Sequence, residues 1–216
     1  TNKPTTLIIN GDLVDFYGLS VFDKNPERRH SVQDEITKAV TVLNTFRKKA
    51  GDKCKIYMTE GNHENRLQKY LWRNPELEGL QALELAKLLE LKQNNIKFVR
   101  VSSDYWKEET GHMKLGDLVI MHGDSRLNGA SASRYSGYSA KNTMMNIQSS
   151  VIMGHIHRLA QVYHTNPYKT IVGIEGGCLC KYTGSANWQQ GFSTFKLKGD
   201  KTSEHRIYRI VDGKIV

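Results

Sequence analysis

The sequence predicts an α/β fold with two packed β-sheets flanked by helices. Up to about residue 95, short apolar runs alternate with helical patterns, as in βαβ units. From residue 96 onward, strand-like segments follow one another and only one clear helix, near residues 136–148, intervenes. No repeat or proline-rich linker divides the 216 residues, a length that can bury a sizeable core. We therefore expect a single domain over residues 1–216.

The clearest element is a helix over residues 31–51. Ser31 and Asp34 form a capping-box pattern, apolar residues recur on one face, and Gly51 ends the segment. The other elements predicted in this half are strands at 5–10 and 54–59 and helices at 64–73 and 77–92. The strands predicted in the second half are 96–101, 113–123, 150–154, 160–165, 169–177, 191–199 and 205–211.

Composition narrows the functional classes. Lysine and arginine total 31 against 22 acidic residues, giving a net charge of +9 that favours phosphate-bearing partners, nucleic acid among them. No apolar run approaches the roughly 20 residues of a membrane-spanning helix, so we expect no membrane partner. Three cysteines are too few for a disulfide framework, which favours reduced thiols and a cytoplasmic location. Oligomeric state is left open.

Metal-competent side chains follow four of the predicted strands, each beside a glycine. In α/β sheets, ligands bind beyond the carboxyl ends of the strands, so these loops are expected to converge. Each motif alone is weak, because Gly-Asp is a common turn and an isolated histidine is usually structural. Four in succession, supplying carboxylate, amide and imidazole, predict a metal site. The residues are Asp12, Asp15, Asn62, His63, Glu64, His122, Asp124, His155 and His157.

The ordered motifs GDLVD, GNHE, MHG and GHIH resemble those of the calcineurin-like metallophosphoesterases. The resemblance spans residues 11–157 and is specific for the superfamily rather than for a substrate. It implies an αββα sandwich of two mixed β-sheets flanked by helices, with a dinuclear metal site on the loops. The expected activity is hydrolysis of phosphate esters.

The resemblance also assigns metal ligands. Asp12 would bridge two divalent metal ions, Asn62, His122 and His155 would complete one site, and His157 would belong to the other. A carboxylate beside imidazoles suits Mn, Fe or Zn better than Ca or Mg. Two such ions bind phosphoryl oxygens, offset charge in the transition state and activate a water molecule.

Catalytic and substrate-binding roles follow from the same motifs. His63 would be the general acid that protonates the leaving oxygen, with Asp15 orienting its ring. Glu64 is expected at the helix start rather than among the ligands. Arg66 and Arg158 are candidate substrate-binding residues, although Arg66 could equally belong to a solvated helix face.

Two departures from the superfamily pattern change these expectations. The Asp-x-His motif that normally precedes Gly-Asp is absent, so we expect a domain truncated at its N-terminus with one metal site incomplete. Phe16 and Glu60 stand where the protein serine/threonine phosphatases carry arginines, which disfavours that activity.

Three functions therefore compete. The leading hypothesis is a metal-dependent phosphoesterase acting on phosphomonoesters or phosphodiesters. A nuclease acting on DNA or RNA is compatible with the net charge of +9. A non-catalytic scaffold that retains the fold is favoured by the missing motif and disfavoured by the intact His63.

Overall fold

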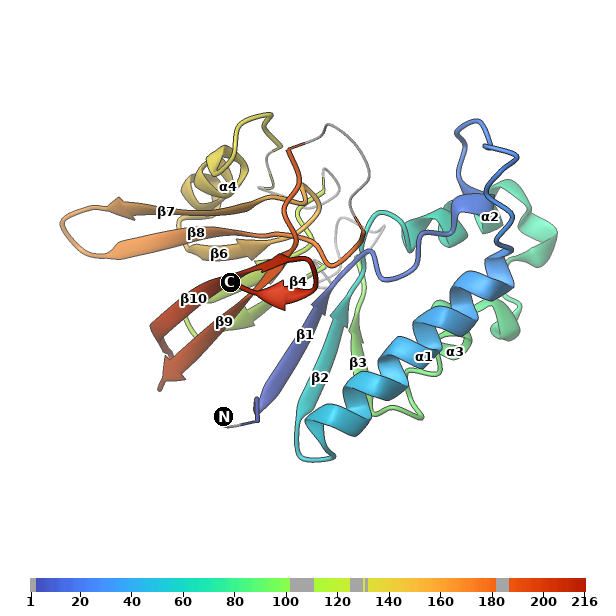
Figure 1. Ribbon diagram of the computed structural model, residues 1–216, viewed down its shortest axis with the longest axis horizontal. Coiled ribbons are helices and arrows are strands. Elements are labelled where there is room, and N and C mark those ends of the chain that lie inside the picture. Colours follow the sequence, from blue (N-terminus) through green and yellow to red (C-terminus); the bar gives the residue numbers. More distant parts are fainter. Residues whose placement is uncertain (1–2, 102–110, 125–129, 131, 182–186) are drawn as a thin grey trace. The chain divides into compact units, whose positions relative to one another are not determined.

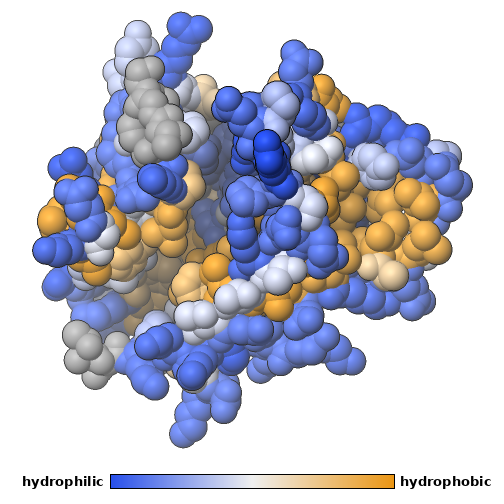
Figure 2. All heavy atoms as spheres, turned by 45° about the vertical axis from the view of Figure 1, so that its right-hand side comes forward, coloured by the Kyte–Doolittle hydropathy of each residue, from blue (hydrophilic) through white to orange (hydrophobic). Residues whose placement is uncertain are grey.

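A computed structural model describes residues 3–101, 111–124, 130, 132–181 and 187–216 of the chain. The chain divides into two compact units, Thr1–Arg100 and Val101–Val216, which we call unit 1 and unit 2. Each unit is described by itself. No helix within the described residues is both long enough and apolar enough to span a membrane. Hydrophilic side chains dominate the face seen in Figure 2, in keeping with 25% charged residues.

Unit 1 is built on a parallel sheet of three strands in the order β1-β2-β3. The strands are β1 (Thr6–Asn10), β2 (Lys55–Thr59) and β3 (Ile96–Val99). They lie side by side with α1 (Val32–Ala50) alongside them (Figure 1). Ile56 and Met58, two residues apart on β2, are both buried in the core that α1 covers. Burial of every second residue is typical of a strand packed on one face. Because the strands are parallel, their carboxyl ends meet at one edge.

The long helix begins and ends as the sequence predicts. The Ser31 side chain accepts a hydrogen bond from the Asp34 backbone, and the Asp34 carboxylate accepts one from the Ser31 backbone, which completes the capping box. Gly51 ends the helix at φ 82°, a conformation that glycine adopts without strain. Ile36 and Leu43 are buried on the face toward the sheet.

The helix predicted at 77–92 is wrong in extent, whereas α2 (Asn65–Arg73) is confirmed. The chain makes short 3₁₀ turns at Pro75–Leu77 and Gln81–Leu83, and α3 (Leu85–Leu88) is a single turn. Gly79, at φ 83°, breaks the helical path. Leucines of this segment instead reach the core from an irregular backbone, so packing outweighed helix propensity.

Unit 2 contains a mixed sheet of five strands in the order β4-β5-β6-β8-β7. Its central strands β5, β6 and β8 are parallel, and β4 and β7 are antiparallel edges. The strands are β4 (His112–Leu115), β5 (Leu118–Met121), β6 (Ser150–Met153), β7 (Leu159–Thr165) and β8 (Thr170–Gly176). The single strand predicted at 113–123 is thus a hairpin, because Gly116 turns the chain at φ 61°.

One helix, α4 (Tyr138–Ile147), packs against the sheet of unit 2 (Figure 1). Ala140 and Met144 contribute to an apolar cluster with residues of β5, β6 and β8. A Cβ at Gly173 would lie 2.9 Å from the Ala140 backbone, so glycine allows the helix to approach closely. The chain ends in an antiparallel sheet of β9 (Gly191–Lys198), β10 (Lys201–Val211) and β11 (Lys214–Ile215).

The predicted α/β class, with sheets flanked by helices, is confirmed. In detail, the described part of the first sheet is wholly parallel and the larger second sheet is mixed. The three cysteines, Cys54, Cys178 and Cys180, are all free thiols, as expected from their odd number.

Candidate metal centre and active site

In unit 1, the loops after β1 and β2 are tied together by one buried carboxylate. Glu64 accepts hydrogen bonds from the backbone N–H groups of Asp12, Val14 and Gly61, at 2.8, 3.0 and 2.9 Å. Hydrogen bonds to a charged acceptor are the strong ones, and Glu64 is 1% exposed. Glu64 therefore fixes the position of Asp12 relative to the GNHE turn, in keeping with its predicted place at the start of a helix.

Gly61 lets the two loops meet. A Cβ at this position would collide with the backbone nitrogen and a carboxylate oxygen of Asp12 and would lie 2.7 Å from Glu64 Oε2. No larger residue fits unless Asp12 moves. The glycine in GNHE is thus explained by a close approach of two loops, rather than by turn conformation alone.

The His63 ring is held by Asp15 and directed toward Asp12. Its Nδ1 lies 2.9 Å from Asp15 Oδ1, and its Nε2 lies 3.9 Å from Asp12 Oδ2. The His63 backbone N–H also donates to Asp12 Oδ1 at 3.0 Å. Because a carboxylate only accepts, Nδ1 carries a proton in this contact. Nε2 faces Asp12 and also lies 3.4 Å from Arg66 Nη2.

Two arginines share Asp15 with His63. Arg66 Nη1 donates to Asp15 Oδ1 at 2.5 Å and to its backbone oxygen at 2.7 Å, and Arg28 Nη2 donates to Asp15 Oδ2 at 2.8 Å. The hydrogen bond from His63, together with those cations, holds the pKa of Asp15 well below its usual range despite partial burial. Asp15 is therefore an anion beside the histidine at neutral pH.

In unit 2, two predicted ligands lie together beyond β5 and β6. The rings of His122 and His155 meet edge to face with centroids 5.3 Å apart, and a ring nitrogen of each lies within 4.8 Å of the other. The His122 carbonyl accepts a hydrogen bond from Gly154 N–H at 3.0 Å, which joins the two loops. His122 is buried and His155 is half-buried.

His157 is packed by an aromatic side chain. Its ring lies edge-on to Trp188, with centroids 4.3 Å apart. Its carbonyl accepts a hydrogen bond from Gln189 N–H at 2.8 Å. The segment at 188–189 therefore positions this histidine from both ring and backbone.

Arg158, the residue after His157, is part of a buried ion pair. Its guanidinium donates to the carbonyls of Ser133 and Arg134, at 2.5 and 2.9 Å, and its Nε lies 3.7 Å from Glu175 Oε2. The other oxygen of Glu175 accepts two backbone N–H groups at the start of α4, at 3.1 and 3.3 Å. These contacts give Arg158 a structural role, and its predicted role in substrate binding remains a prediction.

The comparisons identify the family. The sequence model of the calcineurin-like phosphoesterase family matches residues 1–159 of the chain. The chain belongs to the calcineurin-like phosphoesterases.

Solved structures to which this chain is similar include those of Vps29 from Entamoeba histolytica. A single mutant of Vps29 is 19% identical, with a TM-score of 0.42, over 98% of this chain and 95% of that chain. Wild-type Vps29 complexed with Zn²⁺ is 17% identical, with a TM-score of 0.41, over the same shares of both chains. Among curated proteins, no significant match was found.

The donor set fits the divalent metals expected of a calcineurin-like phosphoesterase. Unit 1 offers the carboxylate of Asp12 and the amide of Asn62, and unit 2 offers three imidazoles. Of the eight non-glycine residues with positive φ among the described residues, Asp12, His155 and His157 are three predicted ligands. This left-handed conformation costs an L-residue about 1–2 kcal/mol, and such strain concentrates at functional sites.

Unit 1 of this calcineurin-like phosphoesterase thus brings Asp12, Asp15, His63 and Glu64 together, and unit 2 brings His122 and His155 together. Phe16 is fully buried in the core of unit 1, in keeping with the absence of the arginine that protein phosphatases carry there. Sequence reasoning missed Arg28 and Glu175. A lone acidic residue in the apolar run TIVGIEGG was a signal for Glu175, whereas nothing in the loop sequence marked Arg28.

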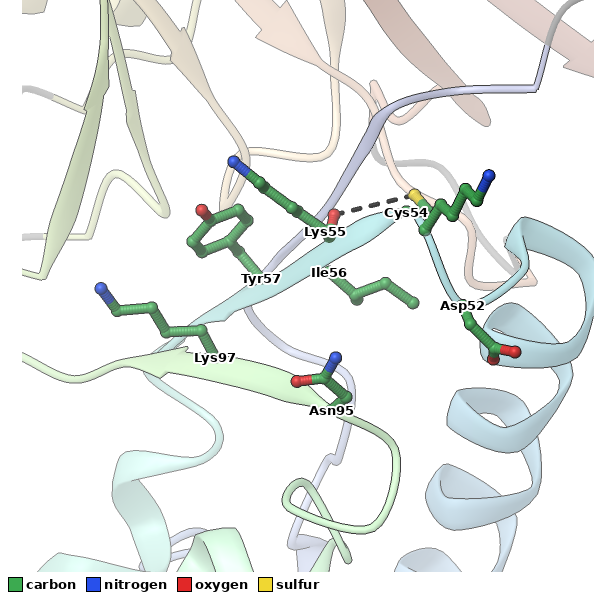
Figure 3. Close-up of a pocket in the computed structure, with 8 residues that line it drawn as sticks. Asp52, Cys54, Lys55, Ile56, Tyr57, Asn95 and Lys97 are labelled. Carbon is green, nitrogen blue, oxygen red and sulfur yellow. Dashed lines mark hydrogen bonds between the residues drawn. The ribbon is translucent and has the colours of Figure 1, made fainter.

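A pocket of unit 1 lies away from these residues (Figure 3). Residues 52–57, with Asn95 and Lys97, line it. They belong to the start of β2 and the neighbouring part of β3, at the opposite end of β2 from His63. None of the predicted site residues lines this pocket.

Proposed function

We propose that this chain is a metal-dependent phosphoesterase that hydrolyses phosphomonoesters or phosphodiesters, with His63 as the general acid. The observation that carries the proposal is the 2.9 Å contact between His63 Nδ1 and Asp15, with His63 Nε2 3.9 Å from Asp12. This arrangement puts an imidazole whose Nδ1 proton is held by Asp15 beside a carboxylate suited to metal binding.

Asp12, Asn62, His122, His155 and His157 would hold two divalent cations, with Mn, Fe or Zn as the candidates. Such cations, when bound, bind phosphoryl oxygens, offset negative charge and lower the pKa of a bound water. A cytoplasmic location, with reduced thiols, is part of the same proposal.

The residues of unit 1 would handle the leaving group. In its doubly protonated form, His63 donates the Nε2 proton to the leaving oxygen, while the proton on Nδ1 stays hydrogen-bonded to Asp15 and keeps the ring from rotating. Glu64 and Gly61 keep Asp12 next to the histidine through backbone contacts. The acid and the metal-binding carboxylate are therefore positioned as a pair.

Metal removal and restoration test this function. Protein stripped with a chelator should hydrolyse neither model monoesters nor model diesters, and Mn should restore turnover. Asp12→Ala should lose metal content and turnover together. Asp52→Ala, at an exposed position, is the control and should retain both. An Asp12→Ala variant with full metal occupancy and wild-type turnover would contradict the assignment. A well-folded, metal-loaded wild type without turnover on any ester would support the scaffold alternative.

A nuclease is the second candidate, favoured by the net charge of +9. The exposed Lys69, on α2, would meet a nucleic-acid backbone beside His63. Single-stranded DNA and RNA belong in the same substrate panel, and their binding should weaken as salt rises, since phosphate contacts release counterions. Absence of any retained DNA or RNA at low salt would eliminate this candidate.

A further inference from the structure

The loop between the 3₁₀ turn Tyr17–Leu19 and α1 is organised around the side chain of Tyr17. The Tyr17 hydroxyl accepts a hydrogen bond from Asn25 N–H at 2.6 Å and donates to the Asp23 carbonyl at 3.3 Å. The Tyr17 backbone N–H donates to the Glu35 carboxylate of α1 at 3.3 Å. The tyrosine ring is therefore a fixed platform at the surface of unit 1.

Arg28 lies on this platform. The centre of its guanidinium is 3.9 Å from the centroid of the Tyr17 ring, a cation–π distance. Its Nη2 donates to Asp15 Oδ2 at 2.8 Å, and the Arg28 side chain is 49% exposed. A guanidinium has five N–H donors in a rigid fork, so one contact with Asp15 leaves most of its binding capacity toward solvent.

Arg66 differs from Arg28 in how much of it is accessible. Its side chain is 17% exposed, donates twice to Asp15 and places Nη2 3.4 Å from His63 Nε2, so it is committed to the support of these two residues. Both arginines reach the same carboxylate as His63, and Arg28 does so from the more exposed side. Of these two arginines that contact Asp15, Arg28 is therefore the more accessible.

We propose that Arg28, held on Tyr17, is a subsite for an anionic group carried by the leaving alcohol of the substrate. The leaving oxygen must come within hydrogen-bond reach of His63 Nε2, and Arg28 contacts the carboxylate held on the other nitrogen of the same ring, so the subsite takes leaving groups long enough to extend past the imidazole to Arg28. Preferred substrates are then phosphate esters whose alcohol bears its own carboxylate or phosphate. This inference rests on the proposed function, with His63 as the general acid.

A matched pair of esters tests the subsite. 3-Carboxyphenyl phosphate and 3-carbamoylphenyl phosphate differ mainly in one negative charge on the leaving group. The wild type should show the higher kcat/KM for the carboxylate, and Arg28→Gln should lower that preference by about tenfold, mostly through KM, as expected for loss of one charge-assisted hydrogen bond. Arg28→Lys should retain part of the preference. Arg29→Gln, the exposed neighbour in the same loop, is the control and should change neither ester.

The outcomes separate this inference from the proposed function. Equal losses on both esters in Arg28→Gln would mean that Arg28 acts only by supporting Asp15, which would overturn the subsite. A wild type that hydrolyses both esters equally well would also overturn it, while leaving the phosphoesterase function intact. If Arg29→Gln lowers the preference for the carboxylate ester as much as Arg28→Gln does, the preference comes from general surface charge and the subsite is overturned. If the wild type hydrolyses neither ester with Mn bound, the subsite fails, and the function fails with it if model diesters are not hydrolysed either.

Discussion

Each unit supports its predicted site with an arginine–carboxylate contact, and the two contacts lie in opposite environments. Arg158 and Glu175 in unit 2 are 10% and 0% exposed at their side chains, whereas Arg28 and Asp15 in unit 1 are 49% and 32% exposed. A buried pair cannot lose one partner without leaving an uncompensated charge, while water replaces an exposed partner readily. The buried pair therefore stabilises the structure of unit 2, whereas the exposed arginine of unit 1 remains accessible to a substrate.

The largest effect on stability should come from breaking the buried contact. Glu175→Ala would leave Arg158 charged and buried and would strip two backbone N–H groups of α4 of their acceptor. We expect a loss of about 3–5 kcal/mol in the free energy of unfolding. Arg28→Ala, which breaks the exposed contact, should cost less than about 1 kcal/mol. Urea unfolding of both variants checks the contrast, and equal losses would abolish it.

A smaller but more local effect should follow from Gly61→Ala. The new methyl group must displace Asp12, because it meets that residue's backbone and carboxylate. We expect about 1–3 kcal/mol of destabilisation from overpacking, together with loss of metal and turnover. Gly79→Ala is the control, since a Cβ there meets nothing within 4 Å, although φ is also positive. It should lower stability modestly and leave turnover unchanged. Unchanged metal affinity in Gly61→Ala would show that the close approach is not required.

The smallest effect on stability concerns pH. The hydrogen bond from His63 and the two arginines depress the pKa of Asp15 in the folded protein below its ordinary value of 3.8. The stabilisation is therefore fully present above about pH 4 and is lost as pH falls through the folded pKa. Asp15→Asn should be less stable than wild type near neutral pH, and the gap should narrow below pH 3.8. Unfolding curves across this range measure it, and a constant gap would argue against Asp15 as the titrating group.

The sequence predicts features that depend on neighbouring residues and misses those that depend on tertiary contacts. The capping box at Ser31 and the metal-competent side chains after strands are local patterns, and the structure has them where expected. The helix at 77–92 was wrong because Gly79 interrupts a pattern that is otherwise helical by propensity. At the candidate site, Arg28 is recognisable only from its contact with Asp15, thirteen residues away, across an irregular loop.

Glu175 illustrates the same limit in unit 2. Its partners on α4 lie 35 and 36 residues earlier in the chain, so no local pattern links them. A single acidic residue in an apolar strand signals a buried partner without naming it. The close approach of Asp12 to Gly61 is likewise visible only in three dimensions, because turn chemistry alone accounts for a glycine in the sequence there.

The central claim is that His63 donates a proton to the leaving group. The most direct measurement is turnover of aryl phosphates with graded leaving-group pKa values, for wild type and His63→Ala, each loaded with Mn and checked for metal content. For phenyl phosphate, a poor leaving group, the variant should lose about 10²–10⁴ in kcat, with a much smaller loss for a dinitrophenyl ester that needs no proton. Metal content and folding should stay near wild type, because the ring is assigned as an acid rather than a ligand. Equal losses across the series, or full activity on phenyl phosphate, would contradict the account.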